Sequence, residues 1–276
     1  MQATCTEKTI IKLNNSAPLK CSDTVIAECS LGIKVNNVFL VTLLCTPDSL
    51  DSLAVGFLQS EGLISSGEEV LNVELDEDKL VVNVTADIGT QVISNVFVRK
   101  KPVYTSGCCQ GVTFREVDDC DFVCWSENNN RYSATDISRW VFALREKGNI
   151  FSKTGGAHMS GMVLDDALAV FHEDIGRHNT IDKVFGSCLL KRIDPSQGLL
   201  VTSGRLSGEM VMKCAMRRVP VIVSSGVATL KAIEIAERNN ITLIGFVRGS
   251  SMNLYTNQWR VEESNNSFVQ AESGSQ

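Results

Sequence analysis

The sequence predicts an α/β protein: a three-layer α/β/α domain preceded by a smaller, mostly β N-terminal part. Two observations predict this class. Paired turn residues divide the first half into short apolar strands, and the second half alternates strands and helices with short joints. The chain of 276 residues is long enough for one large domain or two smaller ones. We expect the N-terminal part to span residues 1–130, the α/β domain 131–260, and a disordered polar tail 261–276.

The elements expected in the first half are mostly strands. Residues 32–44 form a hairpin that turns at Asn36-Asn37, because asparagine tolerates positive φ. A helix capped by Asp48 or Ser49 follows, with Gly62 at its end. The segment 70–84 predicts a second hairpin, and 92–103 supplies one more strand.

The second half begins with a helix from a cap at Ser133 or Thr135 to Lys147, then a hairpin over 162–171. Strands and helices then alternate. The helices are expected at 180–190, 208–218 and 229–239, and the strands at 199–203, 219–225 and 241–247. This alternation predicts a parallel sheet that helices cover on both faces.

Small polar residues follow the three strands of this predicted sheet. The strand ends read Ser203-Gly204-Arg205, Ser224-Ser225-Gly226 and Arg248-Gly249-Ser250-Ser251. Ligands of such sheets bind beyond the carboxyl ends of the strands, and the arginine fork suits phosphate. At any one end the small residues could simply make a tight turn. The three ends together favour an anionic, nucleotide-like ligand.

Two adjacent cysteines, Cys108 and Cys109, lie between Gly107 and Gly111, shortly after the basic run 99–101. Nearby cations lower a thiol pKa, and the thiolate is the form that reacts. The pattern therefore indicates a cysteine that carries or exchanges sulfur, although free cysteine is also a common buried apolar residue.

Metal binding is the alternative use of these thiols. The chain has ten cysteines, including Cys120 and Cys124, but their spacing fits no usual zinc site, and we predict no bound metal.

All three histidines, His158, His172 and His178, lie in one glycine-containing window with Arg177. Such density favours a functional loop that moves protons or holds phosphate over a pair of tight turns. The zinc-deaminase, P-loop and dinucleotide-binding motifs are absent from the sequence. A Cys–His nucleophile pair remains open, because one sequence does not show spatial adjacency.

Charge and hydropathy argue against nucleic acid and membrane as partners. The net charge of −6 argues against a nucleic-acid binder. No apolar run reaches the length of a membrane span, and the first residues lack the features of a signal peptide. We expect a cytoplasmic protein.

Several segments resemble the FdhD/NarQ family, the sulfur-carrier accessory proteins of formate dehydrogenase. The most specific is Glu173-Asp174-Ile175-Gly176-Arg177-His178-Asn179 with Asp182-Lys183. The other matching segments are Thr46-Pro47-Asp48, Ala54-Val55-Gly56-Phe57-Leu58, Ser60-Glu61-Gly62, Thr154-Gly155-Gly156 with His158, Thr202-Ser203-Gly204-Arg205 with Glu209, Gly245-Phe246-Val247-Arg248, and Asn253-Leu254-Tyr255-Thr256.

The resemblance implies a cytidine-deaminase-like α/β domain without the deaminase zinc site. It implies that a loop cysteine accepts persulfide sulfur from a cysteine desulfurase and passes it to the molybdenum bis(guanine dinucleotide) cofactor of formate dehydrogenase. Cys108 matches the first cysteine of the family's C-x-x-C pair, whereas the second position falls on Gly111. The family's cofactor loop matches residues 246–251.

The sequence is therefore interpreted as a sulfurtransferase with Cys108 as persulfide carrier and Cys109 as an auxiliary thiol. The residues expected to bind the guanine nucleotide portion of the cofactor are Phe246, Val247, Arg248, Gly249, Ser250 and Ser251, with Arg177 and Arg205. The expected partners are the desulfurase, the formate dehydrogenase catalytic subunit and a second copy in a homodimer. A chaperone that binds cofactor and apo-enzyme without moving sulfur is the alternative.

Overall fold

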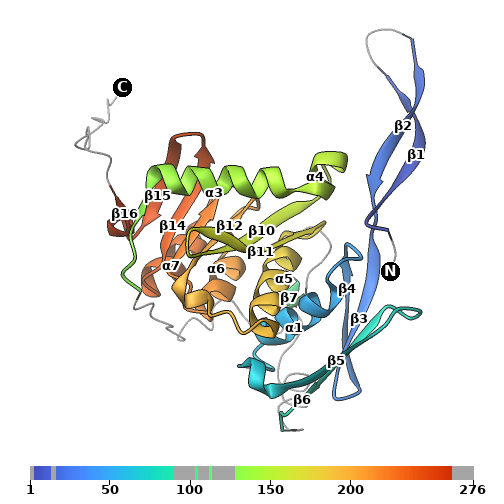
Figure 1. Cartoon of the computed structure of the whole chain (residues 1–276), viewed down its shortest axis with the longest axis horizontal. Coiled ribbons are helices and arrows are strands. Elements are labelled where there is room, and N and C mark those ends of the chain that lie inside the picture. The colour runs from blue at the N-terminus through green and yellow to red at the C-terminus, as the bar shows by residue number, and fades with distance from the viewer. Residues whose placement is uncertain (1–2, 14–16, 90–102, 105–111, 114–127, 263–276) are drawn as a thin grey trace.

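The computed structural model describes residues 3–13, 17–89, 103–104, 112–113 and 128–262 (Figure 1). The expected carrier cysteines, Cys108 and Cys109, lie outside the described residues, as do Cys120, Cys124 and the polar tail. The α/β class is confirmed.

The N-terminal part is built on a four-stranded sheet in the order β4-β3-β6-β5. Its strands are β3 (Cys29–Val35), β4 (Val38–Cys45), β5 (Val70–Asp76) and β6 (Val81–Ala86). Both expected hairpins are present, and Asn36 and Asn37 have φ of 49° and 66°, the left-handed conformation of a tight turn. Helix α1 (Leu50–Ser60) packs its apolar side chains on this sheet and ends before Gly62 at φ 72°.

A two-stranded arm, β1 (Cys5–Lys12) and β2 (Leu19–Ile26), precedes this sheet. Figure 1 shows it extending away from the rest of the molecule. Most of its side chains are exposed or half-buried, so its sequence lacks the buried alternation that identifies a strand. No local pattern therefore predicts the arm.

The second half forms a six-stranded sheet in the order β11-β10-β12-β13-β14-β15. The strands are β10 (His158–Leu164), β11 (Ala167–Asp174), β12 (Leu199–Thr202), β13 (Val221–Ser224), β14 (Thr242–Arg248) and β15 (Ser251–Thr256). The predicted parallel arrangement of the three alternating strands is confirmed, because β12, β13 and β14 run parallel. The sheet as a whole is mixed, because antiparallel strands flank these three. Tight turns fold the chain back at Asp165-Asp166 and near Gly249, which makes the flanking strands antiparallel.

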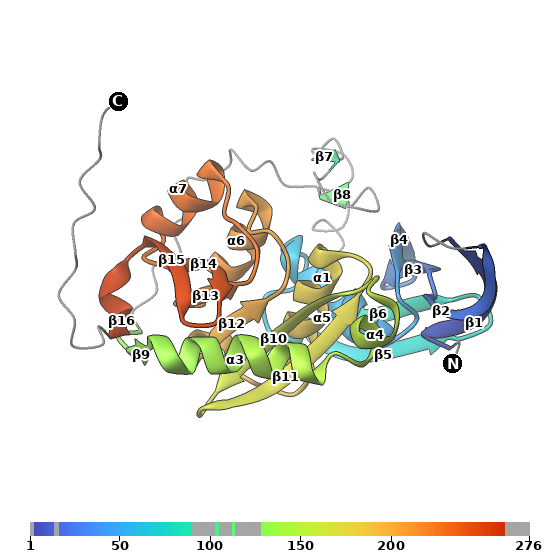
Figure 2. The ribbon, with the colours of Figure 1, turned by 90° about the horizontal axis from the view of Figure 1, so that it is seen from above.

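Helices cover both faces of this sheet, which gives the expected three layers. One face packs against α3 (Ala134–Lys147), which α4 (Asn149–Thr154) follows. The other face packs against α5 (Arg177–Leu190), α6 (Gly208–Ala215) and α7 (Leu230–Arg238). Figure 2 shows α3 on one side of the strands and α6 and α7 on the other. The cap expected at Ser133 is present, since its Oγ accepts the Asp136 N–H at 3.0 Å.

Helices α1 and α5 cross in close backbone contact, and this contact joins the two halves of the chain. A Cβ atom at Gly56 would overlap the carbonyl oxygen of Asp182, and one at Gly186 would overlap that of Ser52. Only glycine permits this approach at either position.

The last described residues return to the start of the α/β domain. Strand β16 (Val261–Glu262) pairs in parallel with β9 (Tyr132–Ser133). Beside it, the fully buried Arg260 donates to the carbonyl oxygens of Asn128 at 3.0 Å and Asn240 at 2.7 Å. Burial lowers the Arg260 pKa to about 10.

Candidate functional site: a cavity at the carboxyl edge of the parallel strands

A cavity of about 380 Å³ opens at the carboxyl edge of β12, β13 and β14. β10 runs antiparallel to β12, so its first residues lie at the same edge. The residues that line the cavity are Arg145, Phe151, Gly155, Gly156, Ala157, His158, Met159, Ser203, Ser225 and Arg248. Three of the predicted strand-end residues, Ser203, Ser225 and Arg248, therefore meet in one cavity.

Arg248 ends β14, and backbone oxygens hold its guanidinium in place. Its Nη1 donates to the carbonyl oxygens of Ser225 at 2.6 Å and Val247 at 2.8 Å. The guanidinium carbon lies 4.9 Å from the centre of the Phe246 ring, within the range of a cation–π contact. The guanidinium is thus oriented at the cavity without a carboxylate partner among the described ion pairs.

The structure corrects the expectation that residues 246–251 form a loop. Phe246, Val247 and Arg248 belong to β14, and Ser251 begins β15. Phe246 has φ of 55°, and the strand register shifts between Gly245 and Arg248. This bulge leaves the Phe246 side chain 46% exposed while Val247 is buried.

Neighbouring strand ends touch through their backbones. Ser224 Oγ donates to the Gly204 carbonyl oxygen at 2.6 Å, and a Cβ at Gly226 would come within 2.7 Å of that oxygen. Ser203 Oγ accepts the Met159 N–H at 2.9 Å, which ties β12 to β10. The small residues at the strand ends therefore serve close packing as well as the cavity wall.

His158 brings a neutral imidazole to this cavity. Burial lowers its pKa, and the positive charges of Arg177, His178 and Arg205 lower it further, against the opposing effect of Asp174. Arg177 and Arg205 do not line the cavity, but they act on its electrostatic potential from the adjoining strand and helix ends. The combination provides hydrogen-bond donors, a neutral base and a surplus of positive charge.

The carboxylates of the segment 173–179 make structural contacts, and the segment belongs to β11 and α5. Glu173 accepts the backbone N–H groups of Asn149, Ile150 and Phe151 at 2.7–2.9 Å and so caps α4. Asp174 pairs with the buried Lys183 at 2.7 Å. Both carboxylates are therefore engaged by the protein itself.

His178 and His172 are likewise tied into internal contacts. His178 Nε2 lies 3.0 Å from Glu209 Oε2, and burial lowers the His178 pKa while this contact opposes the shift. His172 Nε2 lies 2.7 Å from Ser187 Oγ, whose hydroxyl donates to Ser52. Of the three predicted histidines, the structure brings only His158 to the cavity.

Two cavity residues, Arg145 and Phe151, had no place in the sequence-based prediction. Arg145 lies in the last turn of α3, and Phe151 lies in α4, a helix that the sequence analysis did not predict. Conversely, Gly249, Ser250 and Ser251 do not line the cavity. The carbonyl oxygen of Gly249 accepts the Ser138 hydroxyl of α3 at 2.7 Å.

The segment with the predicted carrier cysteines is bracketed by two short paired strands. β7 (Val103–Tyr104) pairs antiparallel with β8 (Val112–Thr113), with Tyr104 opposite Val112. Residues 105–111, which connect them, lie outside the described residues.

Within the described ranges, no group of three or more metal-ligating side chains occurs. Among the same residues, no helix is long and apolar enough to cross a membrane. Neither finding covers Cys120 and Cys124.

The fold and cavity define an α/β protein with a cationic cavity at the edge of a mixed sheet. Residues 26–262 match the model of the FdhD/NarQ family, and the chain belongs to this family. It is 38% identical to the sulfur carrier protein FdhD of Wolinella succinogenes, over 87% of this chain and 83% of the relative. It is 34% identical to that of Bacillus pumilus, over 95% of this chain and 100% of the relative.

A solved structure shares the fold. The crystal structure of a putative formate dehydrogenase accessory protein from Desulfotalea psychrophila superposes with a TM-score of 0.78 at 22% identity. The match covers 94% of this chain and 100% of that one, so it includes both the N-terminal part and the α/β domain.

Proposed function

We propose that this protein is a sulfur carrier in the maturation of formate dehydrogenase. In this proposal Cys108 accepts persulfide sulfur from a cysteine desulfurase, and the sulfur passes to the molybdenum bis(guanine dinucleotide) cofactor. The relatives named sulfur carrier protein FdhD support the carrier role. The transfer would make the protein a cytoplasmic sulfurtransferase, with the cofactor as its bound substrate.

The proposal that the protein binds the molybdenum cofactor rests on the cationic cavity at the strand edge. Arg248 and Arg145 supply charge-assisted donors for phosphate, and the Ser203 and Ser225 hydroxyls add neutral polar groups. Arg177 and Arg205 raise the local positive potential. The exposed ring of Phe246 beside Arg248 offers a flat surface on which a guanine base can stack.

The experiment for the carrier half is intact-mass analysis after incubation with a cysteine desulfurase and cysteine. The wild-type chain should gain the mass of one sulfur atom. Cys108→Ala should abolish this gain, and Cys109→Ala should only weaken it. The matched control is Cys214→Ala, since Cys214 is fully buried and its pKa is raised by burial. A full sulfur gain on the Cys108→Ala chain would refute the assignment.

A chaperone that binds cofactor and apo-enzyme without moving sulfur is the second candidate. It is favoured by Gly111, which stands where the family pattern has its second cysteine. The same experiment separates the two functions, because a chaperone of this kind gains no sulfur even as the wild-type chain.

A further inference from the structure

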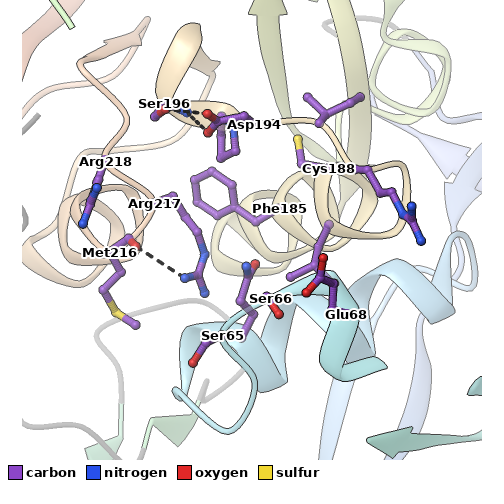
Figure 3. Close-up of a pocket in the computed structure, with 16 residues that line it drawn as sticks. Ser65, Ser66, Glu68, Phe185, Cys188, Asp194, Ser196, Met216, Arg217 and Arg218 are labelled. Atoms are coloured by element: carbon purple, nitrogen blue, oxygen red, sulfur yellow. Dashed lines mark hydrogen bonds between the residues drawn. The ribbon is translucent and has the colours of Figure 1, made fainter. Parts of the chain in front are cut away.

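A second and larger cavity, of about 620 Å³, lies between the N-terminal part and the α/β domain. Its walls are the end of α1 and the loop after it, the end of α5, the turn at Asp194–Ser196, and the end of α6 (Figure 3). Asp194–Ser196 precedes β12, and Met216–Arg218 precedes β13. The cavity therefore lies at the amino edge of the parallel strands, opposite the cavity of Arg248.

Three arginines line this cavity: Arg192, Arg217 and Arg218. Figure 3 draws Arg217 among the residues around the cavity, and its Nη1 donates to the Met216 carbonyl oxygen at 3.4 Å. Arg192 and Arg218 are exposed and take part in none of the ion pairs among the described residues.

Two acidic residues also line the cavity, and among the described residues only one of them, Asp194, has a hydrogen-bond partner for its carboxylate. Asp194 uses its carboxylate to accept the Ser196 N–H at 3.0 Å and the Ser196 hydroxyl at 2.9 Å. Glu68 is exposed and lies in the 3-10 turn Gly67–Glu69 after α1. Among the described residues that line the cavity, Arg192 and Arg218 therefore supply two guanidinium groups against the one carboxylate of Glu68.

A buried amide in the cavity wall is a separate observation that points to a ligand. Gln59 is 6% exposed, and its Oε1 has no hydrogen-bond partner among the described residues. A buried acceptor without a donor is unfavourable, because it has lost its hydrogen bonds to water and gained none in return. A ligand that carries an N–H or O–H group would satisfy this oxygen.

Arg192 and Arg218 occupy backbone positions where glycine is the usual residue. Their φ angles are 57° and 53°, and each follows the last turn of a helix. Ile193 N–H donates to the Cys188 carbonyl oxygen at 2.8 Å, and Val219 N–H to that of Cys214 at 3.1 Å. This is the Schellman ending, in which a non-glycine residue is strained. Strain of this kind clusters at functional sites, and at both positions the residue kept in place of glycine is an arginine.

We propose that this second cavity binds a phosphorylated small molecule whose body carries a hydrogen-bond donor. Arg192 and Arg218 would hold the phosphate, because guanidinium forms bidentate hydrogen bonds with it. Gln59 would accept from the donor, and the buried ring of Phe185 would form the apolar floor. The volume falls in the range of small-molecule sites. The site is separate from the cavity proposed for the molybdenum cofactor.

Methionine-methyl NMR of the full chain tests the proposal, with inorganic pyrophosphate as the probe at constant ionic strength. Met216 lines the second cavity and Met159 lines the first, so the two methyl signals report the sites separately. Met216→Leu assigns one signal and Met159→Leu the other. We expect the Met216 signal to move with pyrophosphate until it saturates.

Arg192→Gly and Arg218→Gly are the decisive variants, because glycine relieves the positive φ while it removes the guanidinium. Each should weaken pyrophosphate binding at Met216 by about tenfold or more. The thermal midpoint should stay the same or rise, so a loss of binding does not reflect unfolding. Arg248→Ala is the control and should leave the Met216 titration unchanged. A Met216 signal that does not saturate, or unchanged affinity in both glycine variants, would overturn the proposal.

Discussion

Lys183 Nζ lies 2.7 Å from Asp174 Oδ2, and both side chains are fully buried. The same lysine donates to the carbonyl oxygen of Thr46 at 3.3 Å, and Asp174 accepts the Thr46 N–H at 3.0 Å. Asp174 also accepts the N–H of Gly176, immediately before Arg177. One ion pair thus links the end of β4 to the start of α5. The first residue of α5 is Arg177, whose charge lowers the pKa of His158 in the strand-edge cavity.

Lys183→Met should lower the free energy of unfolding by about 3–5 kcal/mol, because it leaves the buried Asp174 carboxylate without its counter-charge. Urea denaturation followed by circular dichroism measures the change. Lys79→Met is the control, since Lys79 pairs with Asp76 at 2.8 Å but is 77% exposed. The control should keep the wild-type midpoint. Equal midpoints for Lys183→Met and wild type would contradict the role of the pair.

Gly56→Ala should separate α1 from α5, because the new methyl group would overlap the backbone of Asp182. Overpacking of this kind costs about 1–3 kcal/mol or more, and a backbone carbonyl cannot rotate away as a side chain can. Thermal unfolding should show a lowered midpoint. Gly89→Ala is the matched control, with no atom within 4 Å of the added Cβ. If both variants unfold at the same temperature, the helix contact is looser than the structure indicates.

The stability of the fold should fall when the pH falls from about 6.5 to 4. Burial, with a smaller contribution from Lys183, lowers the His172 pKa from 6.5 to about 4. Between pH 6.5 and about 4, the unfolded chain therefore binds a proton at His172, whereas the folded chain does not. The stabilisation is complete above pH 6.5 and is lost as the pH falls towards 4, by up to about 3 kcal/mol.

His172→Gln isolates this contribution, because the amide can donate to Ser187 Oγ without titrating. Urea denaturation at pH 7.5 and pH 5 should give a smaller difference for the variant than for wild type. The same pH dependence in both proteins would assign the effect to other groups.

Arg248→Ala should weaken GDP binding at the strand-edge cavity by about 1.5–3 kcal/mol, the worth of a hydrogen bond to a charged group. The difference should shrink in high salt, because ions screen the exposed part of the attraction. Calorimetric titration measures both. Arg139→Ala is the control, since Arg139 pairs with Asp136 and Asp166 outside the cavity. Persulfide loading of Cys108 should survive in both variants. Unchanged GDP affinity of Arg248→Ala would remove this residue from the proposed site.

Much of the fold follows from local sequence signals. Asn36-Asn37 and Asp165-Asp166 identify two hairpins, because few residue pairs tolerate consecutive positive φ. Ser133 and Gly148 bracket α3 as expected. The arm β1–β2 and strand β15 escaped prediction, since neither buries the alternate side chains that mark a strand. The domain boundary at residue 130 stays a prediction.

The site was predicted only in part, because strand ends can be located from sequence whereas helix neighbours cannot. Ser203, Ser225 and Arg248 follow from the rule that strand ends share one edge. Arg145 and Phe151 reach the cavity through the packing of α3 and α4, which no local pattern encodes. The contacts of Glu173 and Asp174 could not be predicted, since charged residues that stabilise a fold resemble those that bind a ligand.

The pairing of β9 with β16 brings residues 132–133 beside residues 261–262. The α/β domain is thereby closed by its own two ends, and Arg260 fastens them to Asn128. Because β9 and β16 run parallel, a linker between these ends must cross back over the strand pair. A gene with such a linker that opens the chain in the exposed β10–β11 turn would keep every strand pair of the six-stranded sheet. The closure makes the domain a natural candidate for circular permutation, in which new termini are placed without loss of the core.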